Sequence, residues 1–331
     1  MTTHPVLLVT VDGVPVSGVF FDRLIELSIS DREGVQADTL EMSFDDSPPH
    51  FASPRRGAVV RVSVRMGLRG AADLGAFIVD KVENECLPFV IRVRAHSADF
   101  RAEMKTQKSR HWDGATVKGI VTEIAKEHDL EPQIADAVAG HKYDWIGQQD
   151  ESDLNFLERL ARRHDALFTI KAGRLLWLER GAGKTAAGDD IPEAVIGRQE
   201  VLIGTCRVSD SDVERFKTVK CYWQDKAGSK RREVVVTADK AANGERVLSD
   251  PFSSEAEARR AAEAAAKEIQ RGQIRTSCTV LGNPSLMAGQ PMQYSGIRPG
   301  IDGRVFILET VELTYSKSAG LRSSIEGRLK V

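Results

Sequence analysis

Residues 77–83 read FIVDKVE, and residues 306–312 read FILETVE. The two stretches share the alternation of a half-buried strand. Their coincident apolar residues are Phe77, Ile78 and Val82 in the first copy and Phe306, Ile307 and Val311 in the second. Seven residues of strand pattern also match by chance, so the flanks must decide whether this is a repeat.

Glycines flank the two stretches at comparable spacing. Those before the first copy are Gly57, Gly67 and Gly75, and those before the second are Gly289, Gly296 and Gly303. In both regions a strand pattern lies between the first two glycines and a loop pattern between the last two. The repeat therefore favours a duplicated β-barrel.

The first copy lies in a strand-rich region. Val60, Val62 and Val64 alternate with polar neighbours, and further alternating runs separated by turn residues fill residues 1–95. Many short strands of this kind are typical of a barrel or sandwich. Residues 1–95 are predicted to form the first barrel, and it stays open that this barrel takes strands from beyond residue 180.

Residues 96–180 are predicted to form a small α+β domain. One apolar helical face runs from Val117 to Ala125. A second helix is expected to begin at Asp150 as its N-cap, with acidic residues in its first turn and Arg162 in its last. A hairpin is expected around Ala172-Gly173.

The polar, glycine-rich residues 181–193 are predicted to be a solvated linker. Residues 194–331 are expected to form the second barrel, interrupted by a docking helix at 254–271 that starts with a capping box at Ser254 and Glu257. The predicted fold class is α+β, mainly β: two similar β-barrel domains flank a small α+β domain.

Composition narrows the functional classes. Lys and Arg number 46 and Asp and Glu 48, so stable nucleic-acid binding, which needs a basic surplus, is not expected. No run approaches the apolar length of a membrane helix, and the start resembles no secretory signal. The dispersed cysteines, Cys86, Cys206, Cys221 and Cys278, are expected to be free thiols.

No catalytic, cofactor or metal site is predicted. The GAGKT segment at 181–185 lacks the first glycine of a phosphate-binding loop and no helix pattern follows it. The histidines form no close pair of metal-ligand spacing. Asp150, Glu151 and Asp153 could pass for a catalytic cluster, but their place at a helix start indicates capping.

The run from Gln148 to Arg163 resembles the central signature of the late control gene D family of phage tail proteins. The matching positions are Asp150, Glu151, Ser152, Asp153, Leu154, Phe156, Leu157, Leu160, Ala161 and Arg162. The segments around 105–112, 166–175 and 289–329 continue the resemblance. Two positions depart from it: Asp165 replaces glycine at the helix end, and Glu312 stands where relatives often carry histidine.

The resemblance implies a structural baseplate hub and no enzyme. Such hubs are homotrimers that join the sixfold tail tube to the threefold central spike. Two barrels in each of three chains would present six similar modules. The implied partners are its own copies, the spike, the tube and other baseplate proteins. The implied location is the virion tail baseplate, reached from the bacterial host cytoplasm during assembly.

Three alternatives stay open. The sequence does not separate a phage from a tail-derived bacteriocin or another injection device; neighbouring capsid genes would. A peptidoglycan hydrolase would give a clearing band in a zymogram, abolished by one carboxylate substitution. A DNA-binding regulator would shift duplex DNA with a steep salt dependence.

Overall fold

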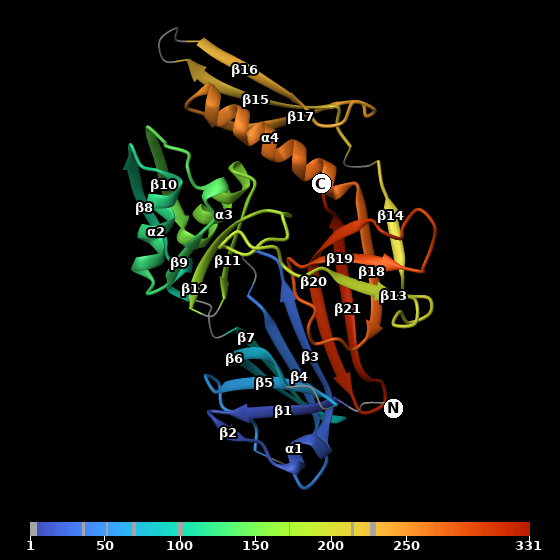
Figure 1. Cartoon of the computed structure of the whole chain (residues 1–331). Coiled ribbons are helices and arrows are strands. Elements are labelled where there is room, and N and C mark those ends of the chain that lie inside the picture. Colours follow the sequence, from blue (N-terminus) through green and yellow to red (C-terminus); the bar gives the residue numbers. More distant parts are fainter. Residues whose placement is uncertain are drawn as a thin grey trace.

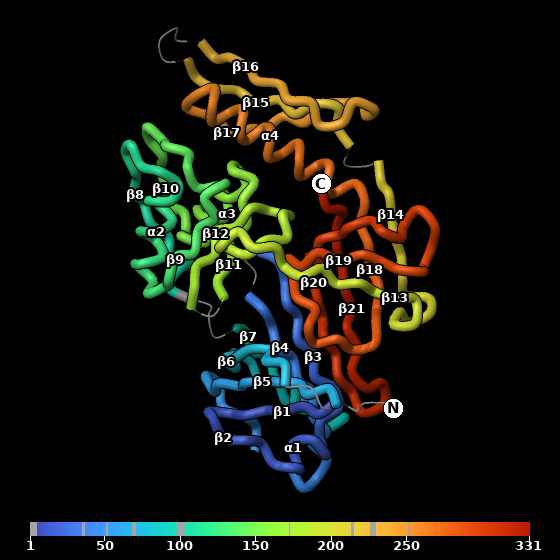
Figure 2. The backbone as a smooth tube through the Cα atoms, viewed as in Figure 1, coloured from blue at the N-terminus to red at the C-terminus, as the bar shows by residue number. Residues whose placement is uncertain are grey.

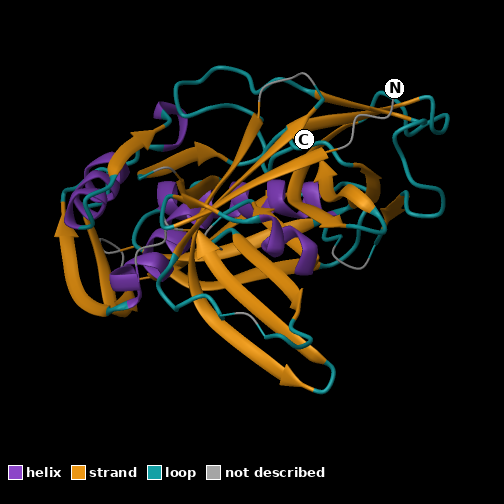
Figure 3. Ribbon diagram, turned by 90° about the horizontal axis from the view of Figure 1, so that it is seen from below, coloured by secondary structure: helices purple, strands orange, loops and turns teal. Residues whose placement is uncertain are grey.

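The computed structural model describes residues 5–34, 37–50, 52–67, 71–97, 102–171, 173–212, 215–225 and 230–331. Strands dominate the molecule (Figure 3), so the α+β, mainly β class is confirmed. Among the described residues, no helix is long and apolar enough to cross a bilayer.

Most strands belong to one 13-stranded sheet with an N-terminal and a C-terminal half (Figure 1). The N-terminal half contains, in spatial order, β3 (Leu24–Arg32), β4 (Thr39–Asp45), β7 (Phe89–Ser97), β6 (Ala71–Cys86), β5 (Val59–Met66), β1 (Pro5–Val11) and β2 (Val14–Pro15), with α1 (Gly18–Arg23) beside them. The C-terminal half contains β14 (Arg207–Asp210), β18 (Ile274–Leu281), β21 (Gly320–Leu329), β20 (Val305–Ser316), β19 (Pro291–Ser295) and β13 (Ala194–Gly197).

The halves are joined because β20 is much longer than β19. Strand β19 has 5 residues and β20 has 12, so the second part of β20 extends beyond β19 and pairs with β3. The first strand region thus takes a strand from beyond residue 180. The described pairings run open from β14 to β2, and two separate closed barrels are not confirmed.

The strand pairs around the two FI-containing stretches have the same register. Val59 lies opposite Ile78, and Pro291 lies opposite Ile307. Gly57 N donates to Val79 O at 2.7 Å, and Gly289 N donates to Leu308 O at 2.7 Å. Both glycines have positive φ, +80° and +83°, which side chains rarely adopt.

Each of these long strands then carries a bulge at the same step. The β6–β7 register shifts between Val79 and Lys81, and the β20–β21 register shifts between Leu308 and Thr310. The extra residues are Asp80 and Glu309, both acidic. A bulge re-aims the strand after it, so β6 and β20 change direction at corresponding positions.

The central unit packs two helices on short strands. Its elements are the 3-10 turn Ala102–Lys105, β8 (Gln107–Asp113), α2 (Val117–Glu127), β9 (Glu131–Ile134), the 3-10 turn Asp136–Val138, β10 (Trp145–Ser152), α3 (Asp153–Arg163), β11 (Ala166–Lys171) and β12 (Arg174–Glu179). Strands β11 and β12 form the predicted hairpin, whose turn residue Ala172 lies outside the described residues. The apolar face of α2 is buried as its spacing predicted.

A separate three-stranded sheet lies at the end of the molecule opposite β1 and α1 (Figure 2). It contains β15 (Thr218–Asp225), β16 (Lys230–Thr237) and β17 (Glu245–Phe252), and α4 (Glu255–Gly272) packs on it through Ala258, Ala261, Ala262 and Ala265. Ser254 caps α4 by accepting from Glu257 N at 3.3 Å. The predicted helix exists, and its small side chains allow close packing on this small sheet.

Candidate functional site

The junction between the two halves of the sheet is a continuous antiparallel ladder. Strands β20 and β3 pair from Thr310↔Arg32 to Ser316↔Glu26. Beyond the ladder, Glu33 N donates to Glu309 O at 2.8 Å. Backbone hydrogen bonds therefore hold the halves in one fixed register.

One face of this junction is a polar groove of about 590 Å³. Ser28 Oγ donates to Glu312 Oε1 across it at 2.8 Å. The charged lining residues are Glu26, Glu41, Glu312, Glu326, Arg32, Arg92 and Arg94. Four glutamates and three arginines line the groove together, so it lacks the uniform positive potential that would hold a phosphate backbone.

A buried ion pair closes one end of the junction. Arg328 of β21 donates to Glu33 at 2.6 Å and lies 3.2 Å from Glu309. At the same joint, Lys171 Nζ of the central unit contacts Asp31 at 2.5 Å and Asp38 at 3.5 Å. Burial raises the pKa of Asp38 to about 6; Lys171 opposes this rise and Asp31 adds to it.

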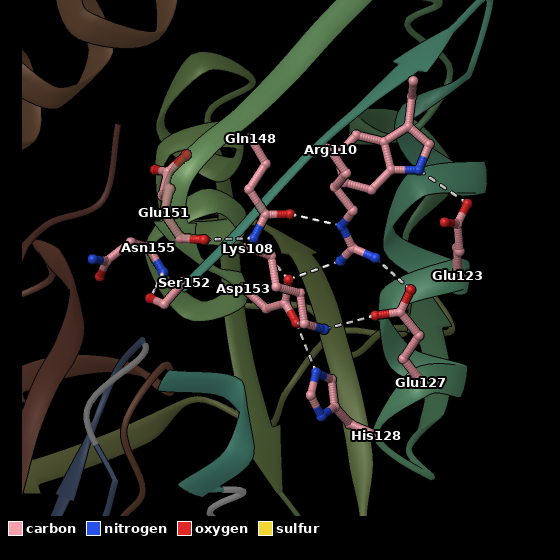
Figure 4. Close-up of polar contacts among 11 residues, drawn as sticks. Lys108, Arg110, Glu123, Glu127, His128, Gln148, Glu151, Ser152, Asp153 and Asn155 are labelled. Carbon is pink, nitrogen blue, oxygen red and sulfur yellow. Dashed lines mark hydrogen bonds and ion pairs between the residues drawn. The ribbon is translucent and has the colours of Figure 1, made fainter. Parts of the chain in front are cut away.

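The signature run leads to a second site, a cluster around the buried carboxylate of Asp153 (Figure 4). Its hydrogen bonds come from Lys108 Nζ at 2.7 Å, Arg110 Nη2 at 2.8 Å, His128 Nε2 at 2.8 Å and Gln148 Nε2 at 2.8 Å. Burial alone would raise the pKa of Asp153. The hydrogen bonds from Lys108, His128 and Gln148, with the charge of Arg110, outweigh it and lower the pKa to about 2.

The same cluster places one ligand atom each of Glu127, His128 and Asp153 within 4.8 Å of one another. Lys108 and Arg110 both bond to Glu127 as well as to Asp153. Two cations thus already balance the two carboxylates, and a metal ion would have to displace them. The geometry favours an ion-pair network that ties β8, α2 and α3 together.

The predicted start of α3 is wrong by two residues. Ser152 is the N-cap, and its Oγ accepts from Asn155 N at 3.3 Å. Asp150 has φ +45° and exchanges hydrogen bonds with Ser109 at a bulge of β10. Aspartate and serine both cap helices well. Asp150 is held in the bulge of β10 by its contact with β8, so Ser152 takes the N-cap position.

The other signature residues divide between core and surface. Those buried in the central unit are Leu154, Phe156, Leu157, Leu160 and Ala161. Glu151 pairs with Arg159 at 2.7 Å, and exposed Arg162 approaches Glu158 only at 4.0 Å. The run thus contributes to packing at most of its positions.

The C-terminal end of α3 binds α4. Asp165 has φ +52°, and its carboxylate accepts two hydrogen bonds from Arg271, each 2.6 Å long. Arg163 Nη1 donates to Glu257 at 3.0 Å. Asp165, where the resemblance implied glycine, adopts the left-handed turn and makes a bidentate pair with α4.

The GAGKT segment and His164 lie in surroundings that the sequence did not predict. In the GAGKT segment, Gly183 has φ +68°, and a Cβ there would lie 2.4 Å from Pro291 Cγ; the expected solvated linker is therefore partly buried. His164 Nε2 lies 2.7 Å from Tyr143 Oη. Burial, with the nearby His141 and two arginines, lowers the pKa of His164 to about 3.

Lys108, Arg110 and His128 were not predicted as partners of Asp153. The only available signal was the alternation of Lys108 and Arg110, which places two cations on one face of a strand. Nothing in the sequence links that face to an aspartate more than 40 residues away. The cluster arises because β10 pairs with β8 and delivers α3 beside it.

The protein is β-rich, and the charged groups of these sites mostly bind one another. The sequence matches the family described as phage tail baseplate hub (GPD) over residues 79–319, and the chain belongs to this family. It is 29% identical over 366 residues to the probable baseplate hub protein of Escherichia phage 186, covering 99% of this chain and 93% of that protein.

Solved structures of low sequence identity share the fold. The 43 kDa tail protein of prophage MuSo2 from Shewanella oneidensis aligns with a TM-score of 0.71 at 15% identity, covering 97% of each chain. The E. coli c3393 protein, a component of the type VI secretion system, aligns with a TM-score of 0.57 at 12% identity, covering 96% of this chain and 76% of that one.

Proposed function

We propose that this baseplate hub protein is a homotrimeric adaptor that joins the sixfold tail tube to the threefold central spike. The observation that supports this proposal most strongly is the matched register of β5–β6–β7 and β19–β20–β21, including the bulges at Asp80 and Glu309. Two equivalent modules in one chain supply six in a trimer, so a threefold assembly can face a sixfold one.

The modules of this proposal are the two similar strand sets, which lie within residues 1–95 and 194–331 and which we propose act as the duplicated barrel domains; the separate sheet β15–β17 stands outside them. Residues 96–180 and the helix at 254–271 stand outside the ring of modules and stiffen it, with residues 181–193 connecting the parts. The signature residues hold the central unit together, because five of them are buried in its apolar core and Asp153 anchors a buried ion-pair network. The proposed partners are the spike, the tube and other baseplate proteins, assembled in the host cytoplasm.

The polar groove at the β3–β20 junction suits the inner wall of the adaptor. Its acidic and basic side chains stay hydrated, and their mixed signs would let a polyanion pass without binding tightly. No catalytic role is proposed for any of them.

Native mass by light scattering tests the proposal, on the chain alone and mixed with the spike protein of the same tail gene cluster. A mass of three chains, or a complex of three hubs on one spike trimer, is expected. A hub that stays monomeric and ignores the spike would overturn the adaptor function.

A further inference from the structure

Two sheet edges lack a backbone partner among the described residues. Strand β6 pairs with β7 as far as Cys86, but β5 reaches only Ile78, so the other edge of β6 is open from Asp80 onward. Strand β14 pairs with β18 alone. Open edges are templates for pairing with another chain.

The duplicated register shows which strand fits each edge. Lys81–Cys86 of β6 corresponds to residues 310–315 of β20, the segment that β3 covers inside the chain. Strand β14 corresponds to β3, because Val208 lies opposite Thr276 as Ile29 lies opposite Leu40. Thr276 and Leu40 in turn face Gly327 and Ala95, which occupy matching positions before the bulges.

We propose that β14 of one copy pairs antiparallel with the Lys81–Cys86 segment of β6 in a second copy. This contact repeats between chains the β20–β3 ladder that each chain makes internally. The inference rests on the proposed threefold function and specifies the surface that would build its ring. The contact is head-to-tail, since two different edges meet, so its repetition can close a ring.

The register can be written residue by residue. Val82 would face Asp210 of the second copy, Asn84 would face Val208 and Glu85 would face Arg207. Inside the chain, the residues matching Val82 and Val208 are Val311 and Ile29, which are 4% and 5% exposed. Val82 and Val208 themselves are only half-buried and would become buried by the new ladder.

Charge complementarity favours the same pairing. Glu85 of β6 and Arg207 of β14 would lie directly opposite, and opposite charges stabilise such pairs. Asp212, which follows β14, matches Glu33 and would lie beside His96, which matches Arg328.

The register supplies its own test, because Cys86 and Cys206 would be cross-strand neighbours, as Tyr315 and Leu27 are inside the chain. Cys86 is exposed and Cys206 half-buried, whereas Cys221 and Cys278 are buried. The assembled hub, with its spike if assembly requires it, is treated with diamide, which oxidises two adjacent thiols to a disulfide and is itself reduced. Non-reducing gels should show linked dimers and trimers.

The single variants Cys86→Ser and Cys206→Ser should each abolish the linked bands, whereas Cys221→Ser should keep them. A band that survives Cys206→Ser would come from another thiol pair and would contradict the register. A hub of three chains that forms no link would overturn this contact and leave the adaptor function standing. A hub that never assembles would fail the function itself.

A charge exchange provides a second measurement. Arg207→Glu should reduce the three-chain mass to that of one chain, and adding Glu85→Lys should restore it. Exposed Lys240 lies on the separate sheet region, so Lys240→Glu, which changes the net charge equally, should leave assembly intact. Assembly unaffected by Arg207→Glu would remove β14 from the interface.

Discussion

The two halves of the large sheet have the same strand order but bury different side chains. Among the described residues between 5 and 97, the buried residues are apolar, and the one buried carboxylate side chain, Glu33 at 6% exposure, points into the junction toward Arg328. The C-terminal half buries Thr276, Gln290, Ser323 and Arg328. The difference shows that the backbone pairing is repeated while the buried side chains differ. The C-terminal half also packs against β3 of the other half and against the linker, which touches it at Gly183.

One pair of matching polar contacts makes the contrast quantitative. At the bulge of the N-terminal half, His96 lies 3.0 Å from Asp80, and their side chains are 29% and 49% exposed. At the matching place, Arg328 lies 3.2 Å from Glu309 and is only 9% exposed. Glu309 remains 30% exposed, and Arg328 is the buried member because Glu33, brought by β3, also binds it. A similar interaction therefore differs in energy with its surroundings.

The largest loss of stability should come from removing Arg328, the buried cation of the C-terminal half. Arg328→Met leaves Glu33 buried without its cation and should lower the free energy of unfolding by about 3–5 kcal/mol. His96→Gln removes the exposed counterpart and should cost less than about 1 kcal/mol. Urea denaturation of both variants measures this, and equal losses would break the comparison.

The next test exchanges glycine and alanine at the matching positions 327 and 95, which lie opposite the last residue before each bulge. A Cβ on Gly327 would lie 2.7 Å from Ile307 O, so Gly327→Ala should cost about 1–3 kcal/mol through backbone displacement. Its counterpart already is Ala95, and Ala95→Gly should cost about 1 kcal/mol through chain entropy. Thermal unfolding separates them; a neutral Gly327→Ala would mean that the strands approach no more closely in this half.

A polar pair in the C-terminal core replaces an apolar one. The hydroxyls of Thr276 and Tyr294 lie 2.6 Å apart, where the N-terminal half has Leu40 and Val62. Thr276→Val or Tyr294→Phe alone should cost about 1–2 kcal/mol, and the double variant little more than either. A double-mutant cycle tests this, and additive losses would mean that the hydroxyls act independently.

The smallest expected effect is a gain. In the matched register of the two halves, Asp38 corresponds to the apolar residue Ile274 of the C-terminal half. Its pKa of about 6 in the folded protein exceeds the ordinary 3.8, so its charge costs stability as pH rises from about 4 through 6. Asp38→Asn should therefore stabilise the protein by about 1 kcal/mol at pH 7 and by nothing at pH 4. Denaturation at both pH values checks it; a loss at pH 7 would indicate that the ion pair with Lys171 dominates.

Sequence reasoning succeeded where the signal is local and periodic. The alternation of Val60, Val62 and Val64 predicted a strand with one buried face, and the spacing of Leu157 and Leu160 predicted the buried face of α3. It failed at Asp150, where two good capping residues stand close together, and in the linker, where Gly183 packs against Pro291. Both outcomes depend on segments distant in the chain.

The amino-acid sequence by itself determined the strand and helix types, the family resemblance and the two similar FI-containing stretches, because periodicity and short motifs act within one element. The tertiary structure decided that β20 and β3 join the halves into one sheet, that Lys108 and Arg110 neutralise Asp153, and that Asp165 binds α4 through Arg271. These contacts join residues far apart in the chain, and their energies come from burial that exists only once the units have packed.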